Sequence, residues 1–126
     1  MSCWFVSRAV LAAAVLALSA QAADAARSCF LSRDWQGWSS PSPNVLYLRV
    51  RLHDIYKVTL SAGSSQLQNP AVHLVSIVRG SSNICSAIDL DLRVADNSGF
   101  ATALIADSLT KLTPDEIAAI PKKYRP

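Results

Sequence analysis

Two aspartates stand two residues apart in the stretch AIDLDLRV, residues 87–94, and of all side chains in this sequence they most invite a chemical interpretation. Residues i, i+2 and i+4 of a β-strand share a face, so a strand here would place Asp89, Asp91 and Arg93 on one side. With a rise of about 3.3 Å per residue, the two carboxylates would lie roughly 6.5–7 Å apart. Such a pair could act as acid and base, as in some glycosidases, or hold a hard cation such as calcium.

The same stretch also fits an ordinary strand with one buried face. The charged positions alternate with four apolar ones, Ile88, Leu90, Leu92 and Val94. These four would face the core while the charged side chains meet water, and Arg93 would neutralise a neighbouring carboxylate. A domain of about 100 residues leaves little room for a deep pocket. We therefore favour the solvated face for Asp89 and Asp91 and keep their chemical use as the alternative.

The stretch RDWQGW, residues 33–38, carries two tryptophans three residues apart. Exposed aromatic rings can stack on sugars or on partner side chains, and they can equally fill a small core. We expect Trp38 in the core and treat Trp35 as a candidate contact residue. The predicted ligand or partner contacts are Trp35, Asp89, Asp91 and Arg93.

No assembled catalytic set is visible elsewhere in the sequence. His53 and His73 are far apart and have no acidic or thiol neighbour at ligand spacing. No G-x-S-x-G frame for a nucleophile occurs, and the four glycines are too dispersed to cradle a phosphate. We therefore predict no metal and no cofactor, and we assign no catalytic residue.

The N-terminus has the three parts of a secretory signal peptide. Arg8 gives a positive start, residues 9–20 form an apolar run, and two A-x-A patterns follow at 20–22 and 23–25. A membrane anchor is the alternative, but the run has about half of the ~20 residues needed to span a bilayer. We predict a signal peptide over residues 1–25, no transmembrane segment after its removal, and a periplasmic or secreted protein of the bacterial envelope.

Export changes the interpretation of the cysteines. Cys3 would leave with the signal peptide, so three cysteines become a pair, Cys29 and Cys85. An oxidising route permits a disulfide between them, and closing that loop would contribute roughly 4 kcal/mol of stability. A metal site and a reactive thiol are the alternatives, but neither cysteine lies in C-x-x-C or near a histidine at ligand spacing.

Length and charge limit the number of domains and the class of partner that we expect. The formal net charge is +3, and Lys and Arg are scattered along the chain. Nucleic-acid-binding proteins concentrate these residues in a stripe with stacking aromatics, so we expect no nucleic-acid partner. Residues 26–126 are too few for two domains, and we predict one small β-rich domain that is a monomer.

Alternation of apolar and polar residues predicts the strands. The predicted strands are residues 45–52, 55–61, 72–78, 84–94 and 100–106. The first two would form a hairpin that follows a proline-rich connector at 39–44. Residues 72–78 are apolar on both faces, which places them deep in the sheet.

The end of the chain carries a helix signal. Thr113 is a good N-cap, Pro114 suits the first helical position, and Glu116 completes a capping box. The fold class is therefore mainly β: a small antiparallel β-barrel or sandwich of five to six strands with a short C-terminal helix.

Several motifs together resemble an uncharacterised family of small exported bacterial proteins, known only as a domain of unknown function. They are CFLSRDWQGW, LYLRV followed by IYKVTL, ICSAIDLDL, and KLTPDEIAAIP near the end. The resemblance covers about residues 28–126 and implies export, one domain and the disulfide. Members often carry a second cysteine pair, which SAGSSQL and ATALIA lack here. The resemblance transfers no catalytic residue.

These observations favour an exported, non-enzymatic binding or structural module of the cell envelope whose partner is an unidentified protein or envelope component. This interpretation rests on the absence of a catalytic set and on a β-rich scaffold that has a disulfide and aromatic residues in its loops. The alternative is a small hydrolase or metal-dependent enzyme that uses Asp89 and Asp91. A secreted inhibitor that presents the loop at residues 62–71 is a third possibility.

Overall fold

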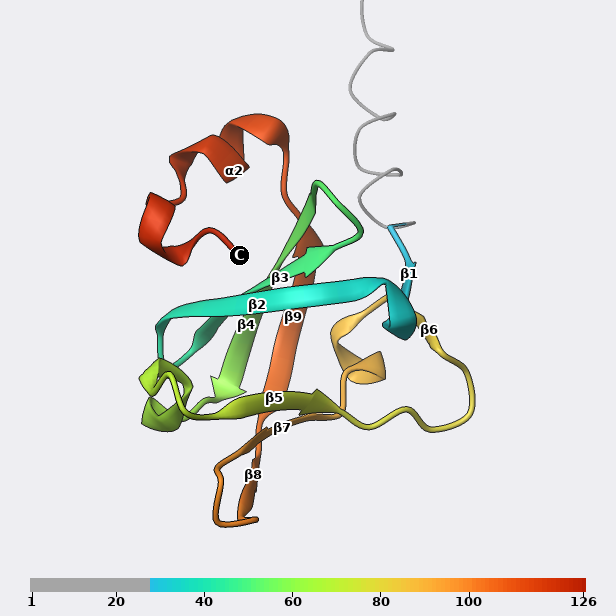
Figure 1. Ribbon diagram of the computed structural model, residues 1–126. Helices are drawn as coiled ribbons and strands as arrows, with labels where there is room; N and C mark the ends of the chain where they lie inside the picture. The colour runs from blue at the N-terminus through green and yellow to red at the C-terminus, as the bar shows by residue number, and fades with distance from the viewer. Residues whose placement is uncertain (1–27) are drawn as a thin grey trace, which may run out of the picture.

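A computed structural model describes residues 28–126, which form nine short strands in three antiparallel sheets (Figure 1). The predicted signal peptide, residues 1–25, lies outside the described residues. The sheets are arranged like a sandwich and do not close into a barrel. The mainly β prediction is confirmed. There are more strands than the five to six expected, because two predicted strands are interrupted and two further strands form near the start of the described chain.

A four-stranded sheet in the order β2-β3-β4-β9 forms one layer. Its centre is the predicted hairpin of β3 (Val45–Val50) and β4 (Asp54–Ala62). Alternate residues of the two strands are buried, namely Leu46, Leu48, Val50, Tyr56, Val58 and Leu60. The period-2 pattern therefore predicted this hairpin correctly.

The turn of the hairpin begins earlier than the sequence indicated. Arg51 adopts a left-handed backbone with φ of 54°, so β3 ends at Val50. Leu52, the last residue of the strand predicted at 45–52, is 81% exposed. The guanidinium of Arg51 donates from Nη1 to Asp54 Oδ2 at 2.8 Å, and this ion pair closes the turn locally.

The proline-rich connector predicted at residues 39–44 is wrong, because β2 (Trp35–Ser42) runs through Pro41. β2 is an edge strand of its sheet, where a residue without an N–H is tolerated. Its pairing with β3 also shifts register between Ser39 and Ser42. The Pro41 carbonyl accepts a hydrogen bond from Gln68 Nε2 at 3.1 Å, so it faces away from β3.

The predicted strand at residues 100–106 is divided between two sheets. β8 (Ala101–Ala103) pairs with β7, and β9 (Ile105–Lys111) pairs with β4. Leu104 lies between them, is buried, and donates its N–H to Leu92 O at 2.9 Å. This residue is where the chain passes from one layer to the other.

The three-stranded sheet has the order β5-β7-β8. β5 (His73–Ser76) was expected deep in the sheet, but β7 (Leu92–Ala95) holds the central place and β5 is an edge strand. His73 and Val75 are exposed in consequence. The prediction that residues 72–78 lie deep in the sheet is therefore wrong. Their apolar residues on both faces suggested burial on both sides, but the outer face of this sheet is open to water.

The continuous strand predicted at residues 84–94 is also wrong. β6 (Asn83–Ile84) pairs with β1 (Phe30–Leu31), a 3-10 turn η3 (Ala87–Asp89) follows, and only then does β7 begin. The sulfur atoms of Cys29 and Cys85 are 2.12 Å apart. The predicted pairing of the cysteines is therefore present, and it joins the residue before β1 to the residue after β6.

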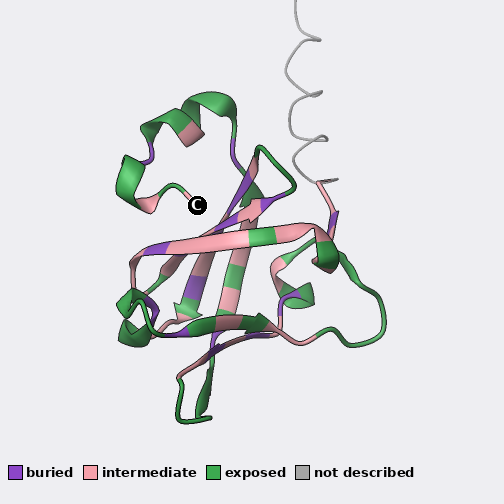
Figure 2. Ribbon diagram, in the orientation of Figure 1, coloured by how far each residue is buried: buried purple, intermediate pink, exposed green. Residues whose placement is uncertain are grey.

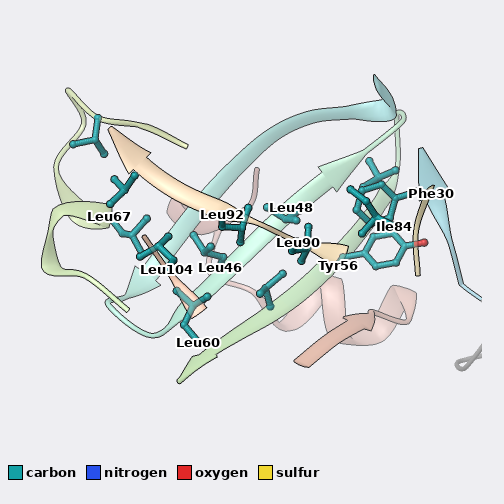
Figure 3. Close-up of a cluster of buried hydrophobic side chains, with 14 residues drawn as sticks. Phe30, Leu46, Leu48, Tyr56, Leu60, Leu67, Ile84, Leu90, Leu92 and Leu104 are labelled. Atoms are coloured by element: carbon teal, nitrogen blue, oxygen red, sulfur yellow. The ribbon is translucent and has the colours of Figure 1, made fainter. Parts of the chain in front are cut away.

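The main core lies between the layers, and its side chains converge from both (Figure 3). The buried residues gather on strands that face one another, whereas the loops and the C-terminal helix are mostly exposed (Figure 2). The rings of Phe30 and Tyr56 lie 4.7 Å apart between centroids, so the small β1–β6 sheet is anchored on β4. Trp35 and Trp38 are half-buried and pack against this cluster.

The C-terminal segment covers part of the outer face of the four-stranded sheet (Figure 1). The predicted capping box is present: Thr113 Oγ1 accepts from the Glu116 N–H at 3.3 Å and begins α2 (Pro114–Ala119). A second cluster forms there from Tyr47, Ile55, Leu112, Ile117, Ile120 and Tyr124. A final turn, η4 (Lys122–Tyr124), follows. No helix within residues 28–126 is long and apolar enough to cross a membrane.

Candidate functional site

An open depression of about 450 Å³ lies beside the turn η3. Its walls come from three parts of the chain: the loop after β5, the turn η3 itself, and the start of β9. Two of the predicted contact residues, Asp89 and Asp91, line it together with Arg79, Ile88 and Ile105. We call this surface the η3 depression.

Asp89 closes the turn that it belongs to. Its Oδ2 accepts the backbone N–H of Cys85 at 2.9 Å and that of Ser86 at 3.0 Å, which makes the reciprocal capping box of η3. The hydrogen bond from the Cys85 N–H, with a second from Ser86, holds the pKa of the Asp89 carboxyl below its ordinary value. A general acid must keep a proton near neutral pH, so Asp89 is unsuited to that role.

Asp91 is engaged by two arginines. Arg79 Nε donates to Asp91 Oδ2 at 3.0 Å, and Arg93 Nε lies 3.8 Å from Asp91 Oδ1. The second separation is too long for a hydrogen bond, and Arg93 Nε is buried without a hydrogen-bond partner among residues 28–126. The negative charge of Asp91 is therefore balanced by its own neighbours, as the solvated-face interpretation expected for Arg93.

The two aspartates share a depression but not a strand face. Asp89 lies in η3 and Asp91 precedes β7, so the strand geometry predicted for them does not exist. Within residues 28–126 there is no group of three or more His, Cys, Asp or Glu that could hold a metal ion. What the arrangement offers at this surface is one carboxylate fixed as a cap and one held in ion pairs.

Trp35 is placed apart from the aspartates. It lies on β2, donates from Nε1 to Gly37 O at 2.8 Å, and lines a separate depression of about 250 Å³ with Trp38 and Leu74. Arg93 lies in β7 opposite Val75 of β5. The structure thus brings together Asp89, Asp91 and Arg93 but not Trp35.

Sequence reasoning missed the apolar rim of the η3 depression. Ile88, expected in the core, is 90% exposed, and Ile105 is 59% exposed. A signal for the first was present, because Ser86-Ala87-Ile88-Asp89 has the S-x-x-D form of a capping box. That motif fixes a turn at Ile88 and projects its side chain outward, whereas alternation alone assigned it to the core.

Comparison of the chain with protein-family models, with curated proteins and with solved structures finds no match.

Proposed function

We propose that the protein is an exported, non-enzymatic binding module of the cell envelope and that the η3 depression is its contact surface. The observation that carries this proposal is the 90% exposure of Ile88 at the rim of a depression whose two carboxylates already have protein partners. Ile88 does not stand alone, because Ile105, which is also exposed, lines the same depression. Exposed apolar side chains that adjoin one another mark surfaces that a partner covers, unlike single scattered ones.

The charges around these isoleucines support a partner interface. The Arg79–Asp91 ion pair lies at the surface, since the Arg79 side chain is 73% exposed. Protein interfaces combine apolar contacts with charged groups at their margin, and Ile88 with the Arg79–Asp91 pair offers both kinds of group at this surface. A partner that covers Ile88 would gain the burial of apolar area without removing a bare carboxylate from water.

The η3 depression is also held in shape before a partner arrives. The Asp89 cap fixes the turn, and the Cys29–Cys85 bond anchors the residue that donates to that cap. A surface that is already ordered loses less conformational entropy on binding. The same bond is compatible with export, because disulfides persist in oxidising compartments. The prediction of export itself rests on the signal-peptide pattern of residues 1–25.

Capture from an envelope extract tests the proposal, with two exposed apolar residues compared. Ile88→Ser should abolish or strongly weaken the capture of a partner by the oxidised protein. Leu52→Ser, at a residue 81% exposed in the β3–β4 turn and outside the depression, should leave it unchanged. Equal capture by both variants would contradict the assignment of the surface.

The enzymatic alternative makes a different prediction. If Asp89 and Asp91 bound calcium or carried out hydrolysis, Asp89→Asn with Asp91→Asn would remove a calcium-dependent rise in Tm or a measurable hydrolytic activity. On the binding proposal, calcium leaves the Tm of the unmodified protein unchanged. A thermal scan with and without calcium therefore separates the two functions.

A further inference from the structure

The free edge of β9 is a main-chain surface that the rest of the described chain leaves without hydrogen bonds. β9 stands at the end of the four-stranded sheet opposite β2 and pairs with β4 on one side. Apart from that pairing, residues 105–111 make no main-chain hydrogen bond within residues 28–126. The opposite edge differs, because Pro41 of β2 has no N–H to donate. β9 is therefore the edge to which another strand can be added.

The pairing at the end of β9 shows which main-chain groups face outward. Leu112, the residue after β9, donates its N–H to Ile55 O at 2.9 Å. In an antiparallel ladder, successive residues alternate between bonding to the neighbouring strand and pointing away from it. Thr110 therefore bonds to β4, whereas the N–H and C=O groups of Leu109 and Lys111 point to the open side. A strand added at this edge would bond to these two residues.

The two charged residues of β9 lie at equal distances along the chain from Leu109. Asp107 precedes it by two positions and Lys111 follows it by two, and both are exposed. Asp107 forms no ion pair with any residue in 28–126. Lys111 Nζ lies 3.6 Å from Asp54 Oδ1, which is too far for a hydrogen bond. Charges on a strand edge discourage pairing with an arbitrary strand, so the strand that fits must carry the opposite charges.

A second copy of β9 carries these charges at the required positions. When two copies run antiparallel about a two-fold axis at Leu109, Asp107 of each copy faces Lys111 of the other. A shift of two residues in either direction keeps the outward main-chain groups opposed but places both charges opposite neutral residues. Parallel pairing without a shift sets like charges against each other, which is destabilising. Only the register centred on Leu109 satisfies the main chain and both charges.

The uncharged side chains of β9 also suit this register. Leu109 is half-buried and packs against the main core cluster, so part of its side chain is left uncovered at the open edge. The Leu109 of a second copy would cover that part. Ser108 of each copy would face Thr110 of the other, and cross-strand pairs of hydroxyl side chains are favourable.

From the open main-chain groups, the self-complementary charges and the half-covered Leu109, we propose that residues 107–111 pair with the same residues of a second copy. The two Leu109 residues bond through the main chain, and an ion pair forms at each end. A strand pair this short is small beside the interfaces of stable dimers, so the dimer is weak. A dilute sample, such as one used for a thermal scan, holds the monomer predicted from the sequence.

This interface does not use the η3 depression. Of the residues of β9, only Ile105 and Ala106 line that depression, and both lie before the proposed pair. The dimer therefore does not depend on the partner proposed for Ile88. Ile88→Ser should dimerise normally, so failure of the dimer and failure of partner capture are distinguishable.

Sedimentation equilibrium of the oxidised protein tests the proposal between about 10 μM and about 1 mM, where weak dimers form. The dimer should appear within this range, and it should weaken as salt rises because ion pairs hold it. Asp107→Lys and Lys111→Asp should each weaken the dimer at least tenfold, because like charges then face each other at both ends. A monomer at every concentration, or an unchanged dimer in either variant, overturns the proposal.

Mixing the two variants gives the sharpest outcome. An equimolar mixture of Asp107→Lys and Lys111→Asp should regain the dimer, because every charge at the interface then meets an opposite one. Both variants should keep the far-UV circular dichroism spectrum of the unmodified protein, which shows that each alone fails to associate and not to fold. A mixture that stays monomeric refutes the register.

A cysteine placed at the two-fold axis tests the interface with both charges in place. The Cα atoms of a hydrogen-bonded antiparallel pair lie about 5.5 Å apart, which is within reach of a disulfide. Mild oxidation of Leu109→Cys should therefore link two copies, as read on a non-reducing gel. Leu52→Cys, at a residue 81% exposed in the β3–β4 turn, should link far less. Equal linking of the two variants would show random collision and refute the axis.

Discussion

The β3–β4 hairpin and the segment from Cys85 to Ala95 look alike as sequence and differ as structure. Both alternate apolar and charged residues. The hairpin is two paired strands whose apolar residues are buried, whereas the segment is a capped turn followed by a short strand. Ser86 and Asp89 make the difference, because their side chains satisfy backbone groups that a strand would have paired with a neighbour. Alternation shows which residues can form a strand, and a capping motif within it can override that preference.

The two regions should also differ in what stabilises them. Removal of the disulfide is expected to have the largest effect on stability. Cys29→Ser with Cys85→Ser should lower the free energy of unfolding by about 4 kcal/mol, from the entropy of the loop that the bond closes. Local opening should concentrate near η3, where Cys85 also donates to the Asp89 cap. Denaturant titration measures the total loss, and amide hydrogen exchange compares η3 with β3 and β4. An equal loss of amide protection in η3 and in the β3–β4 hairpin would contradict this difference between the two regions.

Truncation of one apolar side chain in each region gives the next largest effect. Leu48 is fully buried in the hairpin, while Ile88 in η3, which alternation assigned to the core, is almost fully exposed. Leu48→Ala should cost about 3 kcal/mol through lost burial and a cavity. Ile88→Ala should change stability by less than about 0.5 kcal/mol. Urea unfolding of both variants measures the difference, and similar losses would refute the exposure of Ile88.

The smallest expected effect concerns the charge on the cap. Because hydrogen bonds from the backbone N–H groups of Cys85 and Ser86 lower the pKa of Asp89 in the folded state, its ionised form stabilises the fold above the unfolded pKa of about 3.9. That contribution is lost as the pH falls through the lower, folded pKa. Asp89→Asn should therefore reduce Tm by roughly 2–4 °C at pH 7.

The matched control for this cap is Asp107→Asn, because Asp107 is an exposed aspartate of β9 and is not part of a capping box. It should leave the Tm at pH 7 nearly unchanged. The difference between Asp89→Asn and the unmodified protein should disappear at strongly acid pH, where both carry a neutral side chain. A difference that persists there would show that the geometry of the cap matters more than its charge.

Local signals in the sequence predicted the parts of the fold that depend on neighbouring residues. The β3–β4 hairpin and the Thr113 capping box follow from alternation and capping chemistry, and the pairing of Cys29 with Cys85 follows from counting. The edge position of β5 and the passage at Leu104 between sheets were not predictable in this way. They depend on which strands compete for the centre of each layer, and that is decided by contacts distant in sequence.

The candidate site was predictable only in part for a related reason. Asp89 and Asp91 were found because charged residues in an apolar stretch are conspicuous, and both do line one depression. Ile105, which completes the rim, lies far along the chain and meets Ile88 only through the fold.

Pro41 has a consequence for how copies of this protein behave at high concentration. It interrupts the row of amide donors on β2, one of the two edge strands of the larger sheet, and its carbonyl already accepts a hydrogen bond from Gln68. A second molecule approaching along β2 therefore finds no unbroken ladder to extend. Of the two edges of this sheet, sideways association is left to the β9 edge, whose seven residues include no proline.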